Sequence, residues 1–164
     1  MKFSVSITSN DNTVRLALET ADTSFLGETI SKELERRGIE IVEVVLDREV
    51  GTGMVGMTLL NKISSVVANM FMENKNAILF FYCDDLNEIP RCRTRNISPQ
   101  EYRSNLFSLM FERYVTKHGI QSVHDVTIRI NAIDHCLFFH FISRDEHMDL
   151  IDEIKEDFAA TYSK

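Results

Sequence analysis

Residues 77–83 read Ala-Ile-Leu-Phe-Phe-Tyr-Cys, and residues 98–101 read Ser-Pro-Gln-Glu. The first stretch is a seven-residue apolar and aromatic run, which predicts a buried strand at the centre of a sheet. The second places Ser at the N-cap, Pro at the first helical position and Glu three residues after the Ser, and all three signals predict a helix that begins at Pro99. We expect this helix to reach about His118 and to end at Gly119.

The sequence on both sides of these stretches shows clear periodicity. Apolar residues alternate with polar ones over 3–7 and 14–18, and again over 126–130 and 137–141, which predicts a β-hairpin toward each end of the chain. Helical spacing predicts helices over 25–37 and 54–73, the second largely buried, and a last helix introduced by a second capping box at 143–146. Residues 39–46 are rich in Val and Ile and predict a strand, with either a bulge or burial of both faces.

This element order predicts an α+β fold. We expect a single globular domain over residues 1–164, with a mixed sheet of about six strands, hairpins at both ends and about four packing helices. The 164 residues carry 18 cations and 25 acids, hence a net charge of −7, and 44% of them are apolar. This composition is typical of a globular protein. The acidic balance argues against indiscriminate binding of nucleic acid.

The cysteines and the N-terminus indicate the compartment. Cys83, Cys92 and Cys136 form an odd set with no CxxC, which argues against a disulfide framework and a zinc module. Residues 1–6 lack the features of a signal peptide, and no apolar run approaches the ~20 residues of a membrane helix. We therefore expect a cytoplasmic protein that does not contact a membrane.

The segment from Cys83 to Pro99 is the most unusual part of the chain. If it is extended, its three arginines lie on one face about 6.5 Å apart, an arrangement that suits phosphates or carboxylates. Residues 91–117 hold six cations against two acids. Two interpretations stay open: the arginines pair with acids of this chain, in the acidic turn or the last helix, or they bind an external anion. The candidate binding residues are Arg91, Arg93, Arg95, Arg103, Asp84 and Asp85.

The sequence offers two candidate sets of metal ligands, one for Mg²⁺ and one for zinc. Asp84, Asp85 and Glu88 offer the oxygen ligands that Mg²⁺ prefers. A metal-dependent nuclease would also need a catalytic Lys near these carboxylates, and no Lys lies between positions 75 and 117. We therefore interpret the three acids as a solvated acidic turn. For zinc, the three cysteines and His140 are the available ligands. Cys136 and His140 lie about 13 Å apart along a strand, which is too far to share an ion. We expect no metal and no cofactor, and we interpret Cys83 and His140 as core residues.

Gly51, Gly53 and Gly56 form a G-T-G-M-V-G motif before a predicted helix. Such glycines allow a backbone to approach a pyrophosphate in dinucleotide-binding proteins. Here the motif is expected outside the first βαβ unit, and the acid after the following strand, Asp84, comes later than the usual ~20 residues. We therefore interpret the motif as a glycine-rich helix entry, with a ligand loop as the alternative.

Residues 80–85, 89–91 and 98–104 together resemble a family of small bacterial proteins known as a domain of unknown function. These stretches read Phe-Phe-Tyr-Cys-Asp-Asp, Ile-Pro-Arg and Ser-Pro-Gln-Glu-Tyr-Arg-Ser. The resemblance is strongest over residues 77–116. It implies a bacterial, cytoplasmic protein and assigns no reaction, cofactor or catalytic residue.

The function hypothesis follows from these observations. Because the sequence shows no complete catalytic set, we expect a non-enzymatic interaction module whose protein partner docks on residues 84–103, where Arg is a residue type enriched at interface hot spots. The first alternative is a binder of phosphate, nucleotide or RNA through Arg91, Arg93 and Arg95. The second is a metal-dependent hydrolase that uses Asp84, Asp85 and Glu88. The sequence does not indicate an oligomeric state.

Overall fold

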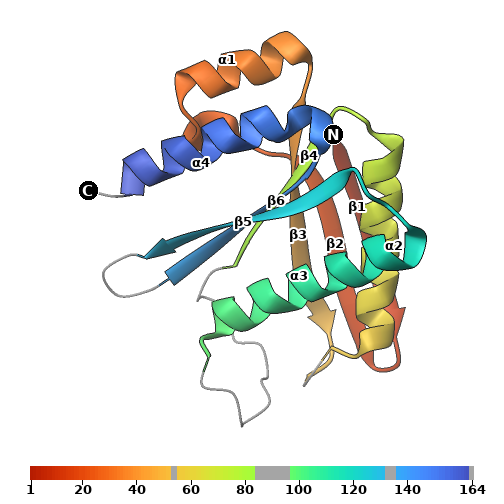
Figure 1. Cartoon of the computed structure of the whole chain (residues 1–164). Coiled ribbons are helices and arrows are strands. Elements are labelled where there is room, and N and C mark those ends of the chain that lie inside the picture. The colour runs from red at the N-terminus through yellow and green to blue at the C-terminus, as the bar shows by residue number, and fades with distance from the viewer. Residues whose placement is uncertain (53–54, 84–96, 132–135, 163–164) are drawn as a thin grey trace.

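The computed structural model describes residues 1–52, 55–83, 97–131 and 136–162 (Figure 1). Its strands are β1 (Lys2–Ser9), β2 (Asn12–Thr20), β3 (Glu40–Val50), β4 (Ala77–Cys83), β5 (Val123–Asn131) and β6 (Cys136–Arg144). Its α-helices are α1 (Glu28–Arg37), α2 (Met57–Glu73), α3 (Pro99–His118) and α4 (Met148–Tyr162), and two short 3₁₀ turns cover Thr23–Phe25 and Asp145–His147. The predicted α+β fold is confirmed.

The six strands form one sheet in the order β1-β2-β3-β4-β6-β5. The pair β3–β4 is parallel, and every other pair of neighbours is antiparallel. Both predicted hairpins are present, β1–β2 and β5–β6. Since β2 and β3 are antiparallel, the unit β3-α2-β4 is the one parallel crossover among the residues described.

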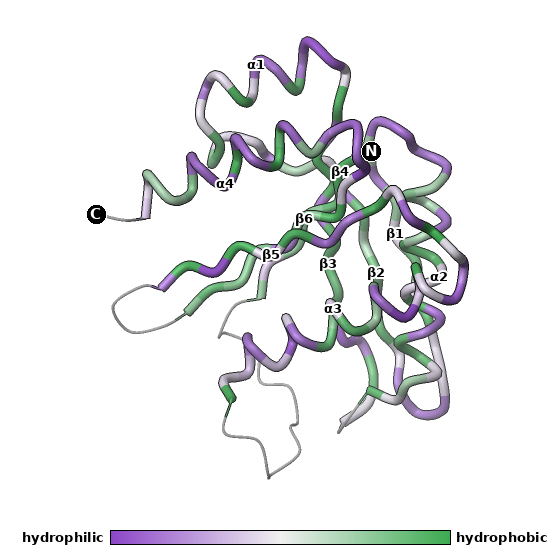
Figure 2. The backbone as a smooth tube through the Cα atoms, viewed as in Figure 1, coloured by the Kyte–Doolittle hydropathy of each residue, from purple (hydrophilic) through white to green (hydrophobic). Residues whose placement is uncertain are grey.

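Helices cover both faces of the sheet. α1 and α4 pack on one face, where Ile41, Ile78 and Phe141 join the apolar sides of the two helices. α2 and α3 lie on the other face, over Leu79 and Phe81. Figure 2 shows the result: β4 and β6 are hydrophobic along most of their length, whereas α1 and α4 alternate between hydrophilic and hydrophobic residues. The central strands are therefore buried on both sides.

Several local predictions hold. α3 begins at Pro99, with the Ser98 hydroxyl accepting a hydrogen bond from the Glu101 amide at 3.2 Å, and it ends at Gly119 in the left-handed region. Gly38 ends α1 in the same way. Of the two alternatives for residues 39–46, burial on both faces is correct, because Ile41 and Val42 are both fully buried.

Three helix starts differ from the prediction. α1 begins at Glu28 rather than residue 25, after a separate turn capped by Asp22. α2 begins at Met57 rather than residue 54, with Gly56 as its N-cap. The prediction of a second capping box is wrong. Ser143 is the last but one residue of β6, and its hydroxyl donates a hydrogen bond to the Arg144 carbonyl. α4 begins only at Met148. At the last of these boundaries, strand pairing with β5 prevailed over the local capping signal.

Candidate functional site

Most of the sequence-predicted binding segment lies outside the described residues. This applies to Asp84, Asp85, Glu88, Arg91, Cys92, Arg93 and Arg95. Arg103 is described: it lies on the second turn of α3 and is half-buried. The choice between internal pairing and an external anion therefore stays a prediction.

The glycine motif has a structural explanation for its first member. Gly51 directly follows β3 with a φ of 103°. A Cβ at this position would lie 2.3 Å from the side chain of Asn12, which begins β2, and 2.7 Å from the Asp11 carbonyl oxygen in the β1–β2 turn. The expectation that the motif lies outside the first βαβ unit is wrong, because β3-α2-β4 is that unit. Gly53 lies outside the described residues, and Gly56 caps α2 with open space around it. Gly51 thus serves the packing of two turns.

The zinc set does not assemble among the described residues. Cys83 is buried on β4, Cys136 begins β6, and the His140 ring is hydrogen-bonded to other side chains. No group of three His, Cys, Asp or Glu in the described ranges is placed to hold a metal ion.

His140 instead joins a polar cluster that the sequence analysis missed. Its Nε2 lies 2.7 Å from the Ser104 hydroxyl on α3, and its Nδ1 lies 2.9 Å from the Asp125 carboxylate on β5. The Ser108 hydroxyl donates to the second Asp125 oxygen at 2.7 Å, and the Thr127 hydroxyl lies 3.2 Å from Nδ1. The neutral tautomer with its proton on Nδ1 satisfies this arrangement, since Nδ1 then donates to Asp125 and Nε2 accepts from Ser104.

The order Ser104–His140–Asp125 is that of a catalytic triad, but the surroundings do not suit acyl transfer. Ser104 is 3% exposed and His140 is fully buried, so no substrate atom reaches the hydroxyl. Ser104 also lies inside a helix, where the backbone amides are already used and cannot stabilise an oxyanion. Phe81 closes the cluster by stacking on the His140 ring at 4.5 Å. We interpret the cluster as a set of hydrogen bonds that holds α3 against the β5–β6 hairpin.

An aromatic surface lies on the face of the sheet that packs against α1 and α4, opposite to α3. We define it by its partly exposed members, Phe25, Tyr82, Phe139 and Tyr162, of which Phe25 is 40%, Tyr82 47% and Tyr162 52% exposed. They come from four elements: the first 3₁₀ turn, β4, β6 and the end of α4. Exposed aromatic side chains that gather on one surface are typical of interaction sites.

Ring contacts make this surface continuous. Tyr82 and Phe139 are direct cross-strand partners with ring centroids 6.1 Å apart. Phe80, two residues before Tyr82 on β4, contacts both rings and stacks on Phe25 at 5.3 Å. Phe158 in turn contacts Phe25, Phe139 and Tyr162 at 5.0 to 6.0 Å. Buried Phe80 and Phe158 therefore support the exposed rings.

Acidic side chains border the aromatic surface. Glu43 on β3 lies beside Phe80 in the parallel register, and the Asp157 carboxylate accepts a hydrogen bond from the Gly27 amide, two residues after Phe25. α4 as a whole carries five acids against one Lys. The border of the aromatic surface is therefore negatively charged.

Ion pairs fix the two helices of this face to each other. Arg37 on α1 donates to Asp149 on α4 and to Glu33 on its own helix. Hydrogen bonds from Arg36 and Arg37 lower the pKa of Glu33 to about 2, and the Arg37 guanidinium also lowers the pKa of Asp149. These groups stay charged at neutral pH, so the ion pairs hold α1, which follows Phe25 in the chain, against α4, which carries Tyr162.

Comparison of the chain with protein-family models, with curated proteins and with solved structures gives no match. The resemblance noted over residues 77–116 therefore stays a prediction. None of the helices in the described part is long and apolar enough to cross a membrane.

Proposed function

We propose that the protein is a non-enzymatic interaction module that binds a protein partner through the aromatic surface. The observation that supports this is the gathering of Phe25, Tyr82 and Tyr162, each at least 40% exposed, on one ring-to-ring surface. Tyr and Phe bring large contact area at a small entropic cost, because each has only two side-chain torsions to fix. A partner that covers these rings gains the free energy of burying them.

The proposal extends the one made from the sequence. β4 ends at Cys83, directly after Tyr82, so residues 84–103 follow the Tyr82 ring closely in the sequence.

The chemistry of the border defines the partner. Glu43, Asp157 and the other acids of α4 surround rings whose faces carry negative charge density. Arg and Lys are attracted both to carboxylates and to aromatic faces. The partner is therefore a protein that presents Arg or Lys beside apolar side chains.

A peptide selection tests this chemistry. A random peptide library is selected on the protein, and the recovered peptides are then assayed for binding to the Phe25→Ser, Tyr82→Ser double variant. The matched control is Leu109→Ser, which removes a 42% exposed apolar side chain from α3 on the other face. We expect peptides rich in Arg, Lys and apolar residues, whose binding weakens with salt and is lost in the double variant only. Selection of acidic peptides refutes the proposal. Peptides that bind the double variant as tightly as the wild type also refute it.

A further inference from the structure

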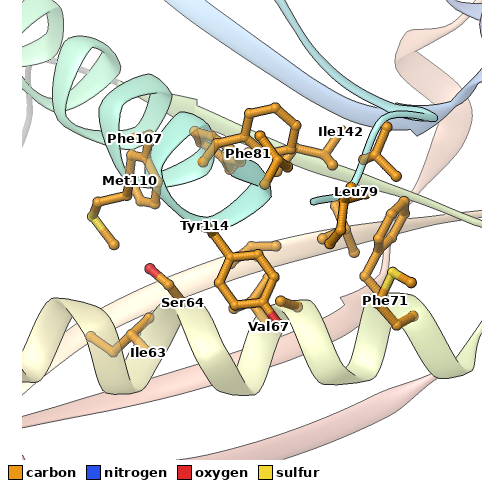
Figure 3. A pocket seen from close by; sticks show the side chains of 17 residues that line it. Ile63, Ser64, Val67, Phe71, Leu79, Phe81, Phe107, Met110, Tyr114 and Ile142 are labelled. Carbon is orange, nitrogen blue, oxygen red and sulfur yellow. The ribbon is translucent and has the colours of Figure 1, made fainter. Parts of the chain in front are cut away.

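The face of α2 and α3 contains a hollow that the proposed interaction does not use. Its volume is about 80 Å³, and it lies between the two helices above the sheet (Figure 3). Buried Ile63, Phe71, Leu79 and Phe81 form its deep part, and Met72, which is 48% exposed, stands at its rim. The predicted burial of α2 is therefore incomplete along the side that faces α3.

The lining of the hollow is almost entirely apolar. Of the 17 residues that line it, only Ser64 and Tyr114 carry a side-chain oxygen, and none is charged. The Ser64 hydroxyl already donates to the Leu60 carbonyl at 3.0 Å. Ordered water needs two to four polar partners, so this lining cannot hold it well. The hollow therefore favours an apolar occupant.

Contacts outside the hollow hold its walls apart. α3 is fastened to β5–β6 by the Ser104–His140–Asp125 cluster. The last turn of α2 is fastened by Arg144, whose guanidinium donates to the carbonyls of Phe71, Asn74 and Lys75 and lies 4.0 Å from the Phe71 ring centroid. Neither helix is free to close the space, although protein interiors seldom leave voids larger than a water molecule. The hollow is thus a built feature of this face.

We infer that the hollow binds the end of an unbranched alkyl chain. A cavity of about 150 Å³ accommodates benzene, so a space of this size is too small for a ring but holds roughly three to four methylene groups. A longer chain continues outward past Met72, which leaves any charged head group in solvent. In Figure 3 the Tyr114 side chain reaches from α3 toward Val67 on α2, so it forms part of the wall beside the hollow.

Methyl NMR of the full-length protein tests the inference with internal controls. Of the seven methionines, Met72 and Met110 line the hollow, whereas Met57 and Met148 lie elsewhere. We expect 1-octanol to shift the Met110 and Met72 methyl signals and to leave Met57 and Met148 unchanged. Phosphatidylcholine vesicles serve as the second probe. A Met110 shift with octanol alone indicates a free chain, and a shift with vesicles alone indicates a lipid-borne one; both support an alkyl occupant.

Filling the hollow separates binding from general hydrophobicity. Ala68→Leu places three more carbons in the hollow, and Ala160→Leu makes the same change at an exposed position of α4. We expect Ala68→Leu to weaken octanol binding at least ~10-fold, because a tenfold loss of affinity corresponds to about two buried methylene groups. We expect Ala160→Leu to bind octanol as the wild type does. The inference is overturned if neither probe moves Met110, if all methionine signals move together, or if Ala68→Leu binds unchanged. These outcomes leave the aromatic surface untouched, so the two proposals fail separately.

Discussion

Replacing His140 with Phe gives the sharpest test of how α3 is held. Phe keeps an aromatic ring for stacking on Phe81, although a slightly larger one, so the change removes mainly the hydrogen bonds of the imidazole to Asp125 at 2.9 Å and to Ser104 at 2.7 Å. A hydrogen bond to a charged partner contributes about 1.5–3 kcal/mol and a neutral one about 1 kcal/mol. The Asp125 carboxylate is only 6% exposed and keeps Ser108 as its donor. We expect His140→Phe to lower the free energy of unfolding by about 3 kcal/mol.

Urea unfolding followed by circular dichroism measures this loss. Ser104→Ala removes one hydrogen bond but adds a better helix former, so its expected loss is smaller, about 0.5 to 1 kcal/mol. The control His118→Phe changes an exposed histidine at the end of the same helix and is expected to stay within about 0.5 kcal/mol. A loss below about 1 kcal/mol for His140→Phe contradicts the fastening role. Covalent labelling of Ser104 by a fluorophosphonate would instead assign catalysis to the cluster.

Three further predictions concern other parts of the fold. Arg144→Met leaves several backbone carbonyls at the end of α2 without donors, and we expect it to cost about 3 kcal/mol in urea unfolding, against about half for Arg144→Lys. Gly51→Ala forces a side chain against Asn12 at a φ of 103°, so it is expected to cost at least about 2 kcal/mol, whereas Gly56→Ser adds an N-cap and stabilises by a few tenths. Glu33 has a pKa lowered to about 2, so its contribution to stability is complete above its ordinary pKa of 4.5 and is lost as the pH falls toward 2. We therefore expect the Tm of Glu33→Gln, measured from pH 6 to pH 2, to vary less with pH than the Tm of the wild type.

The fold was largely predictable because its signals are local. The apolar run of β4, the capping residues of α3 and the glycines after α1 and α3 each act within a few residues, and the structure uses them as predicted. The start of α4 failed because Ser143 also satisfies the alternation of β6, and pairing with β5 extended the strand through it. Strand order was not predictable, since it depends on contacts between segments far apart in the sequence.

The candidate sites were less predictable for the same reason. Ser104, Asp125 and His140 lie on three elements, and only the packing of α3 on β5–β6 brings them together. The spacing of Ser104 and Ser108, four residues apart on one helix face, was the one available signal. Tyr82 read as part of a buried strand, because the sequence does not show that the helices leave its end of the sheet uncovered.

The central claim is that Phe25 and Tyr82 belong to a surface that binds a protein partner. The direct measurement is a quantitative pull-down from native lysate with wild type, the Phe25→Ser, Tyr82→Ser double variant, Leu109→Ser, and a variant with Arg91, Arg93 and Arg95 changed to Ala. Protein and nucleic acid are measured in each eluate. We predict a protein that is recovered with wild type and Leu109→Ser and lost with the double variant. Eluates that are identical for wild type and the double variant, or nucleic acid as the captured species, would contradict the account.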